Sequence, residues 1–354
     1  MVVFLVPYMS KPVIRTLVVI SAIVVLFACS QKSEESYADI EQRSLESWIN
    51  LYVPQAERFG DKMFIERLKT NPSGKPVEAD KWVMVSYQGM TMEGHTFVSR
   101  YGEPLKIEGS YSRRAYYGPA YMPVYEVNSG FSMSNGQHEI LMTMHEGDSV
   151  RAYIPSSLNS NSMGSSSDDV YLGQFSKPAN SPTIWIIKVE EVIDDPHEHE
   201  LKEVENYATL QWGMELTDTL SKGFYFQVTR EAPGDEEYIS KDSKGTIRSY
   251  YAVRLINGFL LDTNIDSIAV RGWGPYEPHN TLPYHFKIMM DDPEMESDLV
   301  AIPAFDSLGG RIRYNEWARM VFISEFGYGV TGTSTINPYT PLVFDLYILP
   351  EKDE

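Results

Sequence analysis

The chain has 354 residues and a formal net charge of −19. This length favours two or three domains, and the strong negative charge argues against nucleic-acid binding because it repels phosphate backbones. The single cysteine, Cys29, excludes an internal disulfide framework and a cysteine-rich metal site.

The first segment has the composition of a secretory signal. Lys11 and Arg15 precede an apolar run over residues 17–27, and Ala28 stands directly before Cys29. A basic start, a short apolar stretch and a small residue at the cut are typical of exported proteins. The run is shorter than the roughly 20 apolar residues of a membrane span, although an uncleaved anchor helix is the alternative. We therefore predict a signal peptide over residues 1–28.

Residues 36–56 have the spacing of an amphipathic helix. Five apolar residues fall near one face, namely Ile40, Leu45, Trp48, Ile49 and Tyr52. That face packs on the neighbouring domain or pairs with another chain, and local packing is the more common use of such helices. We assign residues 29–75 to a tether and this helix.

From residue 82 the apolar period changes to two, which is typical of strands. Strands are predicted at residues 82–87, 96–98, 149–154 and 183–189. Residues 156–169 are rich in Ser, Asn and Gly and are expected to form a loop. We predict a first domain over residues 76–194.

An acidic stretch containing His197 and His199 follows the last of these strands. Alternate residues on a strand share a face, so a metal site is one interpretation. With no third ligand identified, a solvated linker over residues 195–215 is favoured. No metal or cofactor is expected.

A second strand-rich block repeats the order of the first. Strands are predicted at residues 223–228, 250–255, 318–323 and 342–346. The dipeptide Asn257-Gly258 between apolar runs is a strong hairpin signal. The shared order indicates a diverged duplication of α+β domains with mainly antiparallel sheets, the second covering residues 216–354.

The end of this block resembles the FKBP-type peptidyl-prolyl cis-trans isomerases. The segment 325–329 contains a Tyr-Gly pair, residues 336–341 close a loop with Ile and Pro, and residues 342–345 read Leu-Val-Phe-Asp. Residues 301–305 fall where that family has a Val-Ile pair and the aromatic floor of its pocket. Residues 257–264 resemble its Asp-Gly-x-x-Phe-Asp turn and strand, with an insertion before Leu299, and Tyr251 stands where the family has a pocket tyrosine.

The resemblance implies two FKBP-like domains, each a curved antiparallel sheet around a short helix. The first domain matches more faintly and is interpreted as degenerate. Val98 stands where the second domain has Asp262, and Gly130-Phe131 is the candidate pocket floor.

By this resemblance, the catalytic candidates of the second domain are Tyr328, Asp262 and Phe344. The substrate-binding candidates are Tyr251, Leu261, Ile302, Phe305 and Ile336. The apolar members have core burial as their alternative, and a role in capping the turn is the alternative for Asp262. Tyr328 is flanked by glycines, whose flexible backbone lets the tyrosine side chain be exposed at little energetic cost. This setting suits a core residue poorly and favours a functional role.

The resemblance to FKBP-type lipoproteins of Bacteroidetes implies a rotamase that assists the folding of proline-containing exported polypeptides. Residues 26–29 resemble a lipobox, so Cys29 is the expected site of lipidation, for example with palmitate, and of anchoring to the outer membrane. Residues 30–35 resemble a surface-export signal, with an acidic tether as the alternative. A non-catalytic binding or scaffold lipoprotein of the cell envelope is the alternative function, and a component of a surface uptake or adhesion assembly is a third.

Overall fold

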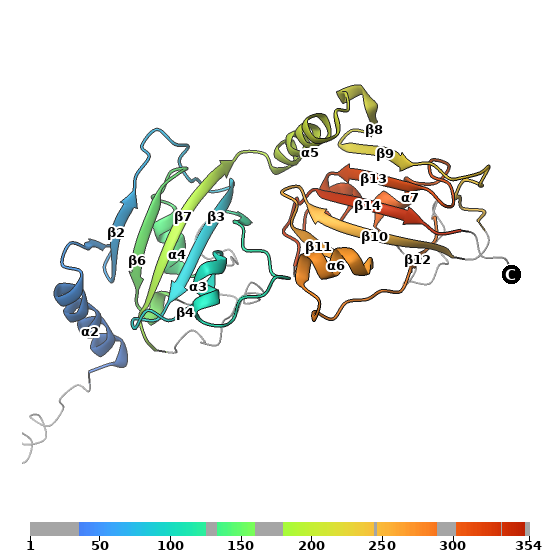
Figure 1. The fold of residues 1–354 in the computed structure, drawn as a ribbon. Coiled ribbons are helices and arrows are strands. Elements are labelled where there is room, and N and C mark those ends of the chain that lie inside the picture. The colour runs from blue at the N-terminus through green and yellow to red at the C-terminus, as the bar shows by residue number, and fades with distance from the viewer. Residues whose placement is uncertain are drawn as a thin grey trace, which may run out of the picture.

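The computed structural model describes residues 35–124, 133–159, 180–243, 246–288, 302–333 and 335–350. They form two antiparallel sheets that lie one after the other along the chain and are connected by helix α5 (Pro196–Trp212) (Figure 1). Few helices accompany these sheets. The predicted α+β class is therefore confirmed.

The first sheet has seven strands in the order β1-β2-β6-β7-β3-β4, with β5 also paired to β3. Their bounds are β1 (Glu57–Phe59), β2 (Met63–Lys69), β3 (Trp82–Met90), β4 (Thr96–Ser99), β5 (Ala120–Pro123), β6 (Ser149–Ile154) and β7 (Thr183–Ile193). All four strands predicted in this block are present. Strands β1 and β2 lie within the segment 29–75 that we assigned to a tether and helix, so that boundary was placed too late.

The second sheet has the order β8-β9-β13-β14-β10-β11, with β12 also paired to β10. Its strands are β8 (Thr219–Ser221), β9 (Phe224–Arg230), β10 (Ile247–Leu255), β11 (Leu260–Thr263), β12 (Tyr284–Phe286), β13 (Trp317–Phe322) and β14 (Leu342–Ile348). The topology is that of the first sheet, strand for strand. Registers also correspond, because Asp262 pairs with Val253 on β10 as Val98 pairs with Gly89 on β3. The repeated order seen in the sequence is therefore a repeated topology.

Each sheet carries short helices. In the first domain, taken here as α2 to β7, these are α3 (Gly102–Ile107) and α4 (Asn135–Leu141). In the second domain, α5 to β14, they are α6 (Asp266–Trp273) and α7 (Pro303–Asp306), with a 3-10 turn η3 (Leu216–Asp218) before β8. Ile140 of α4 and Phe305 of α7 each enter the core of their own domain. These cores lie on one face of each sheet.

A longer helix covers the opposite face of each sheet. Helix α2 (Tyr37–Tyr52) begins at Ser36, whose side chain accepts a hydrogen bond from the Asp39 amide. Its buried residues Leu45 and Ile49 pack against apolar residues of the first sheet, including Phe64. The predicted amphipathic helix is thus present, and its apolar face serves a local core.

Helix α5 corrects the prediction of a solvated linker over residues 195–215. Asp195 caps its first turn, Pro196 occupies the first turn and Gly213 ends the helix at a φ of 67°. One face is buried against the second sheet through Leu201, Val204, Ala208, Tyr225, Val321, Ile323 and Val343. The acidic residues between these positions made the segment look like a solvated linker, because its apolar residues form only a narrow stripe on one face of the helix.

The two long helices use the same anchor. In the first domain, Glu41 of α2 accepts hydrogen bonds from the amide and hydroxyl of Ser156, both at 2.6 Å. In the second domain, Glu200 of α5 accepts from the amide and hydroxyl of Ser324, at 2.7 and 3.1 Å. Each serine begins a 3-10 turn after the sixth strand of its sheet, η1 (Ser156–Leu158) or η5 (Ser324–Phe326). The duplication therefore includes the helix, its carboxylate and the turn that it caps.

The predicted signal peptide and Cys29 lie outside the described residues. Within the described ranges, no helix combines the length and the apolar character needed to cross a membrane.

Candidate functional site

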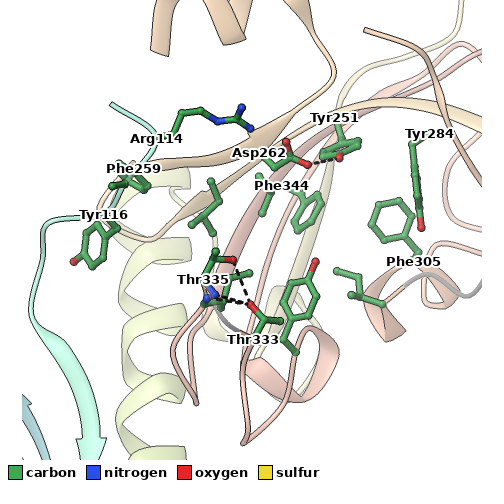
Figure 2. A pocket seen from close by; sticks show the side chains of 16 residues that line it. Arg114, Tyr116, Tyr251, Phe259, Asp262, Tyr284, Phe305, Thr333, Thr335 and Phe344 are labelled. Carbon is green, nitrogen blue, oxygen red and sulfur yellow. Dashed lines mark hydrogen bonds between the residues drawn. The ribbon is translucent and has the colours of Figure 1, made fainter. Parts of the chain in front are cut away.

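A pocket of about 740 Å³ opens in the second domain, and Figure 2 shows the sixteen side chains that line it. This volume lies within the range of roughly 300–1,000 Å³ that is usual for small-molecule sites. The walls come from β10, β11, β12, α7 and β14, and from the loop between η5 and β14. One side is closed by residues 114–116 of the first domain.

All eight residues that the sequence nominated line this single pocket. They are Tyr251, Leu261, Asp262, Ile302, Phe305, Tyr328, Ile336 and Phe344. These residues span 94 positions of the chain. They reach the pocket from the strands β10, β11 and β14, from the short helix α7 and its first flanking residue, and from the loop before β14.

The floor of the pocket is a set of aromatic rings in edge-to-face and tilted contact. Phe305 meets Phe344 with ring centroids 5.7 Å apart and Tyr284 at 5.9 Å, and Tyr251 lies 6.1 Å from Phe344. Phe305 and Phe344 are buried, at 3% and 4% exposure. Centroid spacings of about 4.5–7 Å are those at which aromatic pairs attract. The rings therefore support one another, and their remaining faces line an apolar cavity.

Strand alternation positions this floor. Tyr251 and Val253 are two residues apart on β10 and face the same side, and Val253 pairs with Phe344 on the adjacent strand β14. On the other edge of β10, the turn at Gly258, whose φ is 88°, returns the chain as β11. A positive φ of this kind is cheap only for glycine. The turn thereby places Asp262 opposite β10, at the edge of the pocket.

One polar pair is built into the wall. The Tyr251 hydroxyl donates a hydrogen bond of 2.6 Å to the exposed carboxylate of Asp262. Burial raises the pKa of Tyr251 above its ordinary value, and the bond to Asp262 raises it further. Tyr251 therefore remains a protonated donor throughout the physiological range. The bond holds the Tyr251 ring in place at the pocket wall.

Tyr328 follows η5 in a Gly-Tyr-Gly loop, where Gly329 has a φ of 68°. Its side chain is 40% exposed although it lines the pocket. Burial raises its pKa, and the nearby Tyr284 and Asp262 raise it further. Within the described part of the chain, its hydroxyl makes no hydrogen bond. It is therefore a neutral donor at the pocket surface that a ligand can use.

The loop after Tyr328 is held by a threonine. The Thr333 hydroxyl accepts from the amides of Thr335 at 3.2 Å and Ile336 at 3.1 Å (Figure 2). Just before it, Gly332 has a φ of 63°, and a Cβ there would overlap the backbone carbonyl of Ile336. These contacts direct the Ile336 side chain into the pocket.

Sequence reasoning missed half of the lining. The missed residues are Arg114, Ala115, Tyr116, Val253, Phe259, Tyr284, Thr333 and Thr335. Val253 was open to prediction, because it follows Tyr251 by two positions on a recognised strand. Tyr284 lies in the insertion that follows the predicted turn and has no counterpart in the motif. Residues 114–116 belong to the other domain, and no local pattern connects them to this pocket.

The equivalent place in the first domain has different chemistry. Tyr87, Phe97 and Trp185 correspond in register to Tyr251, Leu261 and Phe344, and all three are buried. Phe97 and Trp185 meet edge to face at 5.5 Å. Val98, 6% exposed, stands at the position of the carboxylate. The candidate floor at Gly130-Phe131 lies outside the described residues.

The histidine pair of residues 197 and 199 does not form a metal site. The two residues lie on a helix, where positions two apart point to different sides. His197 Nδ1 lies 3.3 Å from Glu200, whereas His199 Nε2 lies 3.4 Å from Glu191. Across the described ranges, no three His, Cys, Asp or Glu side chains gather as metal ligands.

No family model matches the chain, and no curated protein matches its sequence. Among solved structures, the chain is similar to the three FKBP domains of wheat FKBP73, with 14% identity and a TM-score of 0.27, over 81% of this chain and 94% of that one. It is also similar to a peptidyl-prolyl cis-trans isomerase from Pseudomonas syringae pv. tomato, with 15% identity and a TM-score of 0.29, over 46% of this chain and 99% of that one. The assignment of the site rests on the geometry of the pocket itself.

Proposed function

We propose that the second domain is an FKBP-like peptidyl-prolyl cis-trans isomerase. The observation that carries the proposal is the convergence of the eight residues nominated by the family resemblance on one open pocket with an aromatic floor. An apolar cavity bounded by a few fixed polar groups is the usual form of a ligand site. Core residues of an ordinary sheet would instead fill the space between them.

Prolyl isomerisation needs little besides such a cavity. Rotation about the peptide bond faces a barrier of about 18–20 kcal/mol, and the uncatalysed step takes on the order of tens to hundreds of seconds. The twisted amide loses its resonance and the charge separation that goes with it. A dry apolar pocket therefore binds it better than it binds either planar form, which lowers the barrier. No covalent intermediate and no proton transfer are involved.

The lining residues have distinct roles in this proposal. Phe305, Phe344 and Tyr251 surround the prolyl ring, with Leu261 and Ile302 beside them. Tyr328 donates its hydroxyl to the carbonyl of the peptide bond or of a neighbouring residue and so sets the register of the chain. Asp262 holds Tyr251 in place and is not an acid or a base.

The test is the isomerisation of a short Xaa-Pro peptide by the full-length chain in detergent. Exchange between the cis and trans signals in nuclear magnetic resonance spectra reports the rate without a coupled protease. We expect acceleration that is proportional to protein concentration and is reduced at least tenfold by Phe344→Ala. Because that variant also loses buried volume, Phe344→Leu is measured beside it, and circular dichroism establishes that both are folded. No acceleration at high protein concentration would refute the enzymatic proposal.

A non-catalytic FKBP-like binding module is the second candidate. Val98 favours it for the first domain, because a valine cannot hold Tyr87 as Asp262 holds Tyr251. If peptides bind the full-length chain and no acceleration follows, this candidate replaces the first.

We also propose that the chain is an exported lipoprotein of the cell envelope whose clients are proline-containing exported proteins. The support is the composition of residues 11–29, with a basic start, an apolar run and Ala28 before the only cysteine. Anchoring through Cys29 would hold both domains beside a membrane where newly exported chains fold.

A further inference from the structure

The pocket of the second domain is completed by the first domain. Residues 114–116 lie between α3 and β5, on a segment that reaches across to the β11 end of the second sheet (Figure 1). Figure 2 shows Arg114 and Tyr116 at the side of the pocket away from Tyr284 and Phe305. The site is therefore composite, and more than 100 residues separate its two parts in the chain.

Tyr116 anchors this segment. Its hydroxyl accepts a 3.0 Å hydrogen bond from the Asn257 side-chain amide, and its ring lies 5.3 Å from that of Phe259. Gly118 makes the arrangement possible, because a Cβ at that position would overlap the Tyr116 hydroxyl. The Tyr116 side chain thus lies against the backbone at Gly118, and it contacts the turn that precedes β11.

Arg114 is held by two contacts that leave most of its donors free for a ligand. Its guanidinium stacks over the Trp273 ring at 4.3 Å, and Nη1 donates a 2.8 Å hydrogen bond to the Pro278 carbonyl. Guanidinium has five N–H donors in a fixed plane that matches a carboxylate. Within the described ranges, Arg114 is in none of the ion pairs that the structure forms. A preoriented cation therefore stands at one side of the pocket.

Arg114 is an isolated positive charge in the pocket of an acidic chain. The chain has 30 Lys and Arg residues against 49 Asp and Glu, and Arg114 is the only Lys or Arg among the sixteen lining residues. The pocket volume of about 740 Å³ leaves room for residues on either side of a prolyl ring. A client segment that leaves a prolyl ring seated over Phe305 and Phe344 on the side of the first domain would extend along the wall that Arg114 lines.

We propose that Arg114 selects clients that carry Asp or Glu beside the proline, so that the first domain sets the sequence preference of the second. This inference rests on the proposed binding of prolyl segments in the pocket. The first domain, whose own equivalent site lacks the carboxylate, acts here as a specificity element.

The test uses the full-length chain and three peptides that differ only in the residue preceding the proline: Glu, Gln or Lys. A second set places the same residues after the proline. An exposed ion pair corresponds to a factor of about 2 to 5, so we expect the Glu peptide of at least one set to exceed the Gln peptide by that factor in kcat/KM. The Lys peptide should fall below the Gln peptide. At 1 M salt, where the Debye length is about 3 Å, the preference should disappear.

Variants assign the preference to one side chain. Arg114→Gln should bring the Glu and Gln peptides to equal rates, and Arg114→Glu should favour the Lys peptide. The control Arg43→Gln removes the same charge from an exposed residue of α2 and should leave the preference intact. Equal rates for all peptides with the wild-type chain would overturn the inference while leaving the isomerase standing. An equal loss for all peptides in Arg114→Gln would also overturn it, since Arg114 would then only fasten the domains together.

Binding of the same peptides, labelled with a fluorophore, separates this inference from the isomerase proposal. If no peptide is isomerised, the enzymatic proposal fails, and the dissociation constants decide the present one. A two- to fivefold tighter binding of the Glu peptide that is lost in Arg114→Gln would uphold it, and equal binding would refute it.

Discussion

At the residue scale, the hydroxyl group of Tyr328 offers a test of the proposed prolyl isomerisation. Replacing Tyr328 by Phe removes the donor at the pocket surface and keeps the ring. A neutral hydrogen bond contributes about 0.5–1.5 kcal/mol, so kcat/KM for an Xaa-Pro peptide should fall by roughly 2- to 10-fold. The unfolding temperature should not change, because the side chain is 40% exposed and its hydroxyl bonds to none of the described residues.

The control for this prediction is Tyr276→Phe. Tyr276 is 96% exposed in the same domain and does not line the pocket. Its replacement should leave both kcat/KM and the unfolding temperature unchanged. If Tyr328→Phe behaves like the control, Tyr328 does not contact the substrate.

The residues of the pocket floor were predictable because strands alternate and because family motifs fix short spacings. Tyr251, Phe305 and Phe344 each belong to such a motif, and the structure brings all three together. Arg114 was not predictable. Its proximity to Trp273 and Pro278 depends on how two domains meet, and local sequence patterns contain no information about contacts made across more than 100 positions.

At the scale of elements, helix α5 shows where composition misleads. Its acidic first half favoured a solvated linker, yet Asp195, Pro196 and Gly213 supply the start and stop signals of a helix. These capping signals were legible in the sequence, whereas the partner of the buried face was not. The composition of a segment reflects the average exposure of its residues. The few buried residues of α5 change that average little, so composition alone did not reveal the buried face.

The anchor of this helix leads to a prediction about pH. Glu200 is 1% exposed. Burial raises its pKa above the ordinary value of 4.5, an effect that its hydrogen bonds from Ser324 only partly offset. The folded state therefore holds this proton more tightly than the unfolded state. Its contribution to stability is complete below pH 4.5 and is lost as the pH rises through the folded pKa.

Glu200→Gln removes this titration and keeps a neutral side chain of the same shape. The stability of the variant relative to the wild type should rise as the pH increases from 4.5 to 7.5, measured by urea unfolding at each pH. The control Glu231→Gln, at an exposed position of the same domain, accounts for the loss of one negative charge. A difference that moves in the opposite direction would mean that the anion is the stabilised form.

At the scale of the whole molecule, the two domains share a topology but differ in the residues of their pocket walls. Both keep the same strand order, the same outer helix and the same glutamate–serine anchor. In the second, the Tyr251 hydroxyl bonds to the Asp262 carboxylate, whereas the first has Val98 at the corresponding position of its sheet. The fold therefore accepts either residue at this position. Topology was predictable from the repeated order of elements, whereas the composite pocket arises only when the two copies meet.

The proposed lipid anchor at Cys29 predicts where the whole protein is found in the cell. Cys29→Ser removes the thiol that lipidation requires, while the apolar run before it remains. An acyl chain contributes about 0.8 kcal/mol per buried CH₂ group, so its loss should move the protein from the membrane fraction to the soluble fraction of the cell envelope. Wild-type protein should incorporate labelled palmitate and require detergent for release, and Cys29→Ser should do neither. Ser30→Ala, one position further along, should behave as wild type. If Cys29→Ser stays in the membrane, the apolar run is an uncleaved anchor helix, and the two domains are tethered by protein and not by lipid.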